Sequence, residues 1–280
     1  MAMEFLKDVF YDLAEKVPEP VAGVVIGKDG LKHCAVCGEP LETIVTIFGK
    51  TRKLACVCSC FTKQEEERQR QEAEMARASR IARLRDTGFS GDDFRNCTFE
   101  TDDGSKPKLT QVAKNYVAHF AELSKAGKGL LFYGSIGTGK TFLAACIANA
   151  LIDKGVPVMM TNFSRIVNRM NERFDGKQEY LDRLNEYGLL VIDDLAAERQ
   201  TEYMTENVYN VIDSRYRAGS PMIITTNLTI EELKNPTSKG MARIYDRVLE
   251  RCFPVEVAGA SHRREKIKQD YQTMKGMLGL

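Results

Sequence analysis

The sequence predicts an α/β fold, in which a parallel sheet lies between helices, preceded by a small cysteine-rich module and a connecting helix. From about Phe89 onward, short apolar runs typical of buried strands alternate with amphipathic helical stretches. A glycine-rich loop at residues 134–141 lies between one such run and a helix. Residues 31–61 contain five of the eight cysteines, which indicates a separate module ahead of the sheet.

The composition limits the class of protein. With 280 residues, the chain is long enough for one α/β core and a smaller module. Lys and Arg number 40 against 39 Asp and Glu, so the net charge of +1 identifies no partner, and any contact with nucleic acid needs a local basic patch. No apolar run approaches the roughly 18 residues of a membrane span. The N-terminal stretch lacks the basic start and apolar centre of a signal peptide, so we expect a cytoplasmic protein with reduced thiols.

The pattern divides the chain into three segments, at residues 1–61, 62–90 and 91–280. The first begins with an amphipathic helix over residues 1–18 and continues into the cysteine module. The second has acidic residues early and arginines late, an order that complements a helix dipole and allows i,i+4 pairs. It is most simply a solvated connecting helix, and a basic face that binds DNA is the alternative.

The cysteines of the first segment have the spacing of a zinc site. "HCAVCGEP" and "CVCSC" would be brought together by a short β-ribbon, and Zn²⁺ prefers four thiolates in a tetrahedron. Five thiols compete for four places, so Cys56 is an alternative ligand, as is the neighbouring His33. Buried structural thiols are the other interpretation. We expect a closed, structural Zn²⁺ site formed by Cys34, Cys37, Cys58 and Cys60.

The glycine-rich loop "GSIGTGKT" fits the phosphate-binding pattern G-x-x-x-x-G-K-[ST]. In such a loop the backbone N–H groups face phosphate oxygens, and the N-terminus of the following helix adds positive potential. Lys140 would reach the β- and γ-phosphates, and the Thr141 hydroxyl would bind Mg²⁺. The predicted nucleotide-binding residues are Gly134, Ser135, Ile136, Gly137, Thr138, Gly139, Lys140, Thr141 and Phe142.

Two later strands end in polar residues that suit the same site. "YGLLVIDDLAAE" ends in Asp193, expected on the Mg²⁺ side, and Asp194, expected to act as general base on the attacking water. "SPMIITTNL" ends in Thr225, Thr226 and Asn227. A polar residue at such a strand end can hold the water or the γ-phosphate, although Asn also commonly turns the chain.

Arginines recur near the end of the chain. Arg243, Arg247 and Arg251 are spaced by four residues, which places them along one face of a helix. One of them would reach the nucleotide of a neighbouring subunit, and a solvated basic face is the alternative interpretation. Arg263 and Arg264 follow and would contact the nucleotide of their own chain.

These motifs, taken in order, resemble the AAA+ ATPases. "LLFYGSIGTGKT", "LLVIDDLAAE", "IITTNL" and "RIYDRVLERC" followed by "GASHRR" look more narrowly like the DnaC/DnaI/IstB group, which includes bacterial and phage replicative-helicase loaders. The resemblance covers roughly residues 94–270. The cysteine module is similar to zinc-binding N-terminal domains found on loaders of this group, especially phage and Gram-positive forms.

The resemblance implies roles for individual residues. It implies an AAA+ P-loop core that binds ATP or ADP with Mg²⁺, with Lys140 and Thr141 in Walker A. Asp193 and Asp194 would form Walker B, where the shorter second carboxylate, Asp in place of the usual Glu, implies slow hydrolysis stimulated by assembly or DNA. The remaining roles would be sensor 1 for Asn227, the trans-acting arginine finger for Arg247 with Arg243 as its helper, and sensor 2 for Arg263. Little chain follows Val255, so the helical lid would be reduced or absent.

Residues 161–174 fall where related initiators place an element that contacts single-stranded DNA. Basic residues that follow phosphates, with an aromatic nearby, suit an unstacked strand. An ordinary amphipathic helix with an exposed basic face is the alternative. The predicted DNA-binding residues are Asn162, Phe163, Arg165, Arg169 and Arg173.

The function implied is that of a helicase loader in the cytoplasm of a bacterium or a phage-infected host. Its partners would be a hexameric replicative DNA helicase, bound through the zinc module, and single-stranded DNA. With ATP and helicase bound, it would form a ring or spiral of its own copies. The alternatives are an IstB-like helper of DNA transposition and, less favoured because of the arginine helix, a P-loop phosphotransferase.

Overall fold

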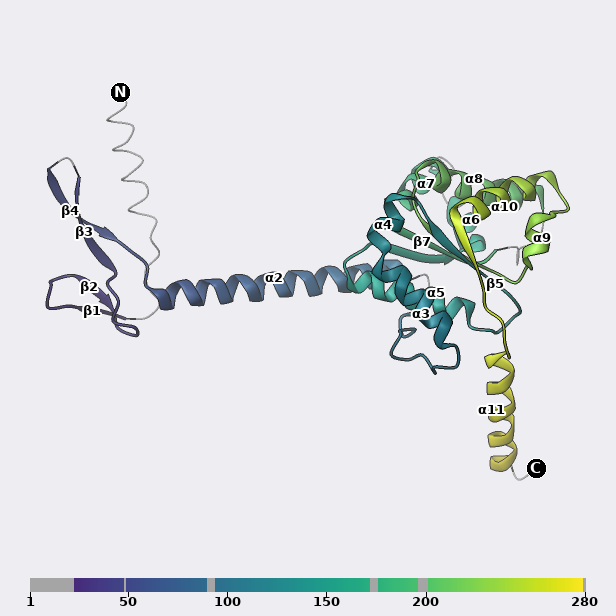
Figure 1. The fold of residues 1–280 in the computed structure, drawn as a ribbon, viewed down its shortest axis with the longest axis horizontal. Helices are drawn as coiled ribbons and strands as arrows, with labels where there is room; N and C mark the ends of the chain where they lie inside the picture. Colours follow the sequence, from purple (N-terminus) through teal and green to yellow (C-terminus); the bar gives the residue numbers. More distant parts are fainter. Residues whose placement is uncertain (1–22, 48, 90–93, 172–175, 196–200, 279–280) are drawn as a thin grey trace. The chain divides into compact units, whose positions relative to one another are not determined.

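The computed structural model describes residues 23–47, 49–89, 94–171, 176–195 and 201–278 (Figure 1). The helix predicted at residues 1–18 and the predicted DNA contact Arg173 lie outside these residues. The chain separates into two compact units, Met1–Ala78 and Ser79–Leu280. Their boundary falls within one long helix, α2 (Ser59–Gly88), and the segment limits drawn at residues 61 and 90 stay predictions.

The part of the first unit that the structure describes contains two short hairpins and the beginning of α2. β1 (Val24–Ile26) pairs antiparallel with β2 (Lys32–Cys34), and β3 (Glu42–Ile47) pairs antiparallel with β4 (Lys50–Ala55). The buried cluster is small, formed by Cys34, Leu41 and Cys58 with Cys60 and Phe61 packed against it. So small a core stabilises a fold weakly, and modules of this kind usually need a metal or disulfides.

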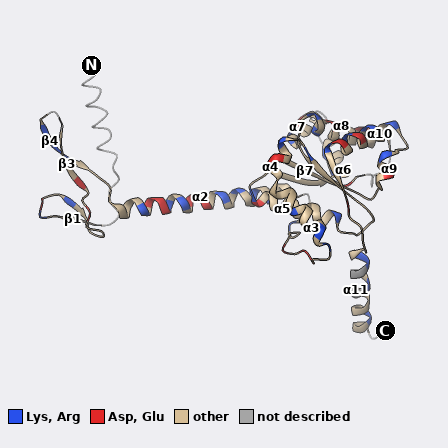
Figure 2. Ribbon diagram, viewed as in Figure 1, with Lys and Arg blue, Asp and Glu red and all other residues tan. Residues whose placement is uncertain are grey.

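Helix α2 begins where a carboxylate caps it. Glu39 accepts hydrogen bonds from the backbone N–H of Ser59, at 2.5 Å, and from its hydroxyl, at 2.8 Å, which satisfies a free amide of the first turn. Acidic and basic residues both lie along α2 (Figure 2). Arg68 pairs with Glu65 and Glu72 at the three- and four-residue spacing expected of a solvated helix.

The second unit contains a five-stranded parallel sheet with the strand order β6-β7-β8-β5-β9. This confirms the predicted α/β class. Among the helices that the structure describes, none is both long and apolar enough to cross a membrane. The strands are β5 (Gly129–Tyr133), β6 (Val158–Asn162), β7 (Leu189–Leu195), β8 (Met222–Thr226) and β9 (Cys252–Glu256).

Helices cover both faces of this sheet (Figure 1). Successive side chains of a strand point to opposite faces, so alternate residues of the strands belong to two separate hydrophobic cores. In β7, Leu189 and Val191 belong to one cluster, and Leu190 and Ile192 to the other. The first cluster includes α3 (Pro107–Ala118), α4 (Phe120–Lys125) and α5 (Lys140–Asp153). The second includes α6 (Phe163–Asn171), α7 (Lys177–Glu186), α8 (Glu202–Arg217), α9 (Ile230–Lys234) and α10 (Lys239–Arg251).

The chain that follows β9 is short. Within the described part, α11 (His262–Leu278) is the single helix after this strand. The backbone N–H of His262 donates to the Gly137 carbonyl at 3.0 Å, so the first turn of α11 lies against the glycine-rich loop. This end of the chain therefore takes part in the surroundings of the loop.

Gly129 marks the closest approach of β5 to its neighbour β8. A Cβ atom at this position would lie 1.7 Å from the Met222 carbonyl oxygen. We predict that Gly129→Ala forces these strands apart and lowers the free energy of unfolding by about 3 kcal/mol, the upper range for an overpacked core. Urea unfolding followed by circular dichroism measures the loss. Gly276→Ala, on α11 with nothing within 4 Å of its Cβ, is the control and should not destabilise. An unchanged midpoint for Gly129→Ala would contradict the strand geometry.

Candidate functional site

The glycine-rich loop joins β5 to α5 in a conformation that only glycine adopts easily. Gly134, Gly137 and Gly139 have φ values of 135°, 81° and 93°. At Gly137 an added Cβ would also lie 2.2 Å from the Ser261 hydroxyl oxygen. The loop therefore curls tightly at the N-terminus of α5, where backbone amides and the helix dipole attract an anion such as phosphate.

Lys140, the first residue of α5, folds back over this loop. Its ammonium donates to the carbonyls of Gly134, at 2.9 Å, and Ser135, at 2.7 Å, and to Oδ1 of Asn227 at 2.8 Å. Burial lowers the pKa of Lys140. The structure thus brings together Lys140 and Asn227, which lie far apart in the sequence, with the lysine charge over the loop.

Asp193 connects β7 to both the loop helix and the next strand. Its Oδ1 atom accepts hydrogen bonds from the hydroxyls of Thr141, at 2.8 Å, and Thr225, at 2.7 Å. Burial raises the pKa of Asp193, and these two hydrogen bonds oppose the shift because they stabilise the carboxylate. A carboxylate and a hydroxyl at this separation offer the hard oxygen ligands that Mg²⁺ prefers, so the residues present fit that ion.

Asp194 has a strained backbone. Its φ is 57°, a left-handed value that no other non-glycine residue of the described chain shares. The pairing of β7 with β8 shifts register between Ile192 and Leu195, and the Asp194 N–H donates to the Thr225 hydroxyl at 2.9 Å. This local departure from the strand places Asp194 among the residues that line the loop cavity. Backbone strain of this kind is often found at functional sites.

The loop opens into a cavity of about 530 Å³ that contains most of the predicted nucleotide contacts. This volume lies within the usual range for small-molecule sites. The lining residues are Thr101, Asp103, Ile136, Gly137, Thr138, Gly139, Lys140, Thr141, Phe142, Asp194, Asn227, His262 and Arg263. The predicted residues Gly134, Ser135 and Asp193 lie behind this lining, bonded to Lys140 or Thr141.

Sequence reasoning missed one wall of this cavity. Thr101 and Asp103 lie ahead of α3, and the Asp103 carboxylate lies 3.4 Å from Nδ1 of His262. Nearby, the Lys106 ammonium donates to the Thr138 carbonyl at 2.5 Å. Nothing in the residues around position 103 marks them as neighbours of the loop, because these contacts depend on how α3 packs against α5.

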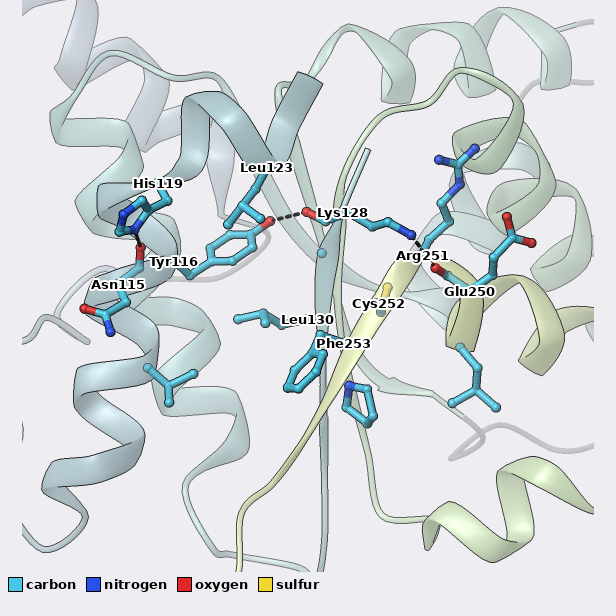
Figure 3. Close-up of a pocket in the computed structure, with 14 residues that line it drawn as sticks. Asn115, Tyr116, His119, Leu123, Lys128, Leu130, Glu250, Arg251, Cys252 and Phe253 are labelled. Atoms are coloured by element: carbon cyan, nitrogen blue, oxygen red, sulfur yellow. Dashed lines mark hydrogen bonds between the residues drawn. The ribbon is translucent and has the colours of Figure 1, made fainter. Parts of the chain in front are cut away.

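A second cavity, of about 560 Å³, lies between α3 and the edge strand β9 (Figure 3). It is mostly apolar, and Phe253 at its rim is 70% exposed. Two of its polar side chains are hydrogen-bonded to backbone carbonyls: the Tyr116 hydroxyl donates to the Lys128 carbonyl at 3.1 Å, and the Lys128 ammonium donates to the Glu250 carbonyl at 2.9 Å. It contains none of the predicted catalytic residues.

The arginines of α10 differ in their surroundings. Arg247 is held within its own chain, where it donates to Asp213 at 2.8 Å and to the Tyr209 hydroxyl at 3.1 Å. Its guanidinium also lies over the rings of Tyr209 and Tyr216, at 4.9 and 5.5 Å from their centroids. Arg243, one turn earlier, is exposed, and its side chain has no bonding partner among the described residues.

The prediction that Phe163 contacts DNA is wrong. Phe163, Ile166, Val167 and Met170 form the buried stripe of α6, so the Phe163 ring lies in the core and is not available to stack on a base. Their spacing of three and four residues is an ordinary helical signal that the sequence already contained. The DNA contacts predicted for the remaining residues of this region stay predictions.

The remaining residues of α6 keep a polar surface. Arg165 and Arg169 are exposed on this helix. The Oδ1 atom of Asn162 accepts a hydrogen bond from the Arg165 backbone N–H at 2.9 Å, so the side-chain oxygen of this predicted DNA contact caps the helix.

The first unit brings together the four cysteines that were favoured as zinc ligands. The sulfur atoms of Cys34, Cys37, Cys58 and Cys60 all lie within 4.8 Å of one another. Four sulfurs at about 2.3 Å from a zinc ion would lie about 3.8 Å apart, so the cluster fits a tetrahedral site. Backbone hydrogen bonds from Cys37 and Val36 lower the pKa of the Cys34 thiol to about 6, which favours the metal-binding thiolate.

The alternative ligands are occupied elsewhere. The Cys56 thiol donates to the Pro40 carbonyl at 3.2 Å and lies outside the cluster. The His33 ring contacts the Gly38 carbonyl at 3.0 Å through Nδ1 and the Asp29 carboxylate at 2.9 Å through Nε2. The pKa of His33 is raised by the Gly38 carbonyl and the Asp29 side chain. A structural role for His33, fixing the cysteine loop, accounts for these contacts.

Comparison with known proteins agrees with this geometry. Residues 60–270 match the family model described as IstB-like ATP binding protein. The chain is 25% identical to the replicative helicase loader DnaI of Bacillus subtilis over 247 residues, which cover 83% of this chain and 79% of the relative. It is 27% identical to the replicative helicase loader DnaC of Escherichia coli K12 over 188 residues, which cover 63% of this chain and 74% of the relative. A crystal structure of DnaI superposes with a TM-score of 0.52 at 25% identity, covering 64% of this chain and 98% of that one.

We predict that Cys58→Ser loses the bound metal, because it removes one of four ligands, whereas Cys56→Ser keeps it. Elemental analysis of the purified chains measures the difference. The unaltered protein and Cys56→Ser should contain about one zinc per chain, and Cys58→Ser far less. Zinc that is retained in Cys58→Ser but lost in Cys56→Ser would overturn the choice of ligands, and its absence from the unaltered protein would overturn the site.

Proposed function

Because the chain belongs to the IstB-like ATP-binding protein family, we propose that it is an ATP-dependent loader of a replicative DNA helicase. It binds the hexameric helicase and delivers it onto single-stranded DNA. The observation that carries this proposal is the convergence of the glycine-rich loop, Asp193, Asp194 and Asn227 on one site. The likeness to two proteins named as replicative helicase loaders, DnaI and DnaC, supports it.

Each residue of the site has a separate role in the proposed ATP hydrolysis. Lys140 neutralises charge on the β- and γ-phosphates, and Thr141 and Asp193 would hold Mg²⁺. When bound, this ion would supply further neutralisation of phosphate charge. Asp194 accepts the proton of the attacking water, and Asn227 holds that water in line. Arg263, on the first turn of α11, lines the cavity and contacts the phosphates of its own chain. Hydrolysis is slow until a neighbouring subunit completes the site.

The arginines of α10 supply that completion. In a ring or spiral of copies bound to ATP and helicase, Arg243 and Arg247 of one subunit face the nucleotide of the next. Arg243 is exposed and needs no rearrangement. Arg247 has to exchange Asp213 and Tyr209 for the neighbour's phosphates, so the ATP of an assembled neighbour competes with these partners. Assembly is thereby linked to the nucleotide.

The cysteine module is the helicase-binding part of the chain. It exposes several large aliphatic side chains, a feature found on interaction surfaces. They are Val24, Val25, Ile26, Val36, Ile44 and Val57. Single-stranded DNA binds the other unit, with Arg165 and Arg169 of α6 contacting phosphates. The protein acts in the cytoplasm of a bacterium or of a phage-infected host.

A helper protein of DNA transposition is the second candidate, and the description of the matching family supports it. Such a helper uses the same ATPase core to remodel duplex DNA and recruit a transposase. The cysteine module favours the loader, because transposition helpers of this group usually carry a helical N-terminal domain. A pull-down with the full chain and ATP separates the two: a hexameric helicase supports the loader, and a transposase supports the helper.

We predict that Val36→Asp weakens binding to the purified helicase about 10-fold or more, because it places a charge within an apolar contact. Biolayer interferometry with the full chain and ATP measures the affinity. Met75→Asp, on α2, is the matched control, because Met75 is 65% exposed and Val36 is 71% exposed. Equal affinities for the two variants, with zinc retained in both, would place the helicase surface elsewhere.

We predict that Arg247→Ala leaves ATP binding intact and lowers hydrolysis by the assembled protein about 1,000-fold, the lower end of the effect of a trans-acting arginine. Fluorescent-nucleotide binding and phosphate release measure the two properties. Arg217→Ala is the control, because Arg217 pairs with the other oxygen of Asp213 but lies on α8. Lys140→Ala should lose nucleotide binding altogether. Normal hydrolysis by assembled Arg247→Ala, with loss in Arg243→Ala, would transfer the role to Arg243.

A further inference from the structure

The Thr225 hydroxyl forms hydrogen bonds with both residues of the acid pair, Asp193 and Asp194. Thr225 is the penultimate residue of β8, at the carboxyl end of the strand, and is 0% exposed. Its hydroxyl donates to Oδ1 of Asp193 at 2.7 Å and accepts the backbone N–H of Asp194 at 2.9 Å. A threonine hydroxyl has one hydrogen to donate and lone pairs to accept, so one side chain serves both acids without conflict.

We propose that Thr225 is a positioning residue for the acid pair, acting through Asp193 and Asp194 without contacting the nucleotide. The proposal deepens the proposed ATPase function and rests on it. It assigns to Thr225 a role different from that expected of the strand end, where a polar residue was predicted to hold the water or the γ-phosphate. Asn227 is the better candidate for holding the water or the γ-phosphate, because Asn227 lines the cavity and Thr225 does not.

The backbone of Asp194 needs this contact. Left-handed φ values are unfavourable for residues with a side chain, so the surrounding structure has to stabilise them. The register shift after Ile192 removes Asp194 from the regular pairing of β7 with β8. Its amide therefore takes a side-chain oxygen in place of a strand carbonyl, and Thr225 supplies that oxygen. Loss of the hydroxyl would leave the partly buried Asp194 N–H without this partner and free Asp194 to relax away from the cavity.

The orientation of Asp193 depends on the same hydroxyl. Thr141 and Thr225 both donate to Oδ1 of Asp193. In phosphate-binding loops of this type, the threonine of the loop is also a ligand of Mg²⁺. A hydroxyl that binds the ion through its oxygen keeps its hydrogen, so Thr141 could go on donating to Asp193. Thr225 is the donor of this pair that is not itself a ligand of the ion, and its contact does not depend on the ion. The contact thus keeps Asp193 aligned both with and without the ion.

The neighbouring threonine provides a matched comparison. Thr226 is also 0% exposed, and its hydroxyl also bonds across to β7, but it donates to the Leu195 carbonyl at 2.8 Å. It accepts the Leu228 N–H at 3.2 Å and contacts neither acid. A change of Thr226 to valine therefore removes a buried hydroxyl from the same strand pair without touching the acid pair.

The test compares Thr225→Val, Thr225→Ser and Thr226→Val in the full chain. We expect Thr225→Val to lower kcat about 10- to 100-fold, the effect of one lost hydrogen bond to a charged group, and Thr225→Ser to recover most of it. Nucleotide affinity in EDTA should stay within about 2-fold of the unaltered protein, while the gain in affinity on adding Mg²⁺ should fall about 10-fold. Thr226→Val should show neither change. If Thr225→Val does not fold, Thr225→Ala against Thr225→Ser isolates the same hydroxyl.

Two results would overturn the proposal. One is Thr225→Val with unchanged kcat and unchanged Mg²⁺ dependence at equal thermal stability. The other is equal losses in Thr225→Val and Thr226→Val, which would assign the effect to packing. Failure of the ATPase itself is distinguishable: if the unaltered protein binds nucleotide without hydrolysing it, the Mg²⁺ arm still decides the role of Thr225.

Discussion

One partly buried carboxylate, that of Asp193, joins the parts of the ATP site to one another. It accepts hydrogen bonds from the hydroxyls of Thr141, in the first turn of α5, and Thr225, near the end of β8. This side chain of β7 therefore links the helix after the glycine-rich loop to the centre of the sheet. Burial makes its charge costly, and the two hydroxyls, together with the charge of Arg263, offset part of that cost. The position of the loop helix, the end of β8 and the acid pair are therefore interdependent.

The sheet is built so that this junction can exist. Gly129 lets β5 approach β8 closely, and the register shift in β7 turns Asp194 toward the cavity. Lys140 then meets Asn227 across the same strand ends. Parallel strands place their carboxyl ends at one edge of a sheet, and ligands of open α/β sheets bind there. Residues separated by nearly ninety positions meet for this reason.

The cysteine module is stabilised in a different way from the sheet. Its buried cluster is too small to stabilise two hairpins, so four converging thiols and the Glu39 cap on α2 provide the organisation that an apolar core provides in the sheet. Several aliphatic side chains remain exposed for the same reason, since the buried cluster within the described residues is too small to receive them. A module of this kind suits binding, whereas the sheet suits chemistry.

The sequence by itself determined the fold class and the phosphate loop, and it indicated the two acids and the cysteine group, because each is a local pattern whose chemistry depends on spacing along the chain. It left Cys56 and His33 open as ligands, and the structure gathers the sulfur atoms of Cys34, Cys37, Cys58 and Cys60 without them. The tertiary structure decided what spacing does not contain. It buried Phe163, paired Arg247 with Asp213 while leaving Arg243 exposed, and brought Asp103 to His262. It also turned Thr225, and not only Asn227, into part of the site. These outcomes depend on which helix packs against which strand. Such contacts join residues far apart in the chain, so local spacing does not predict them.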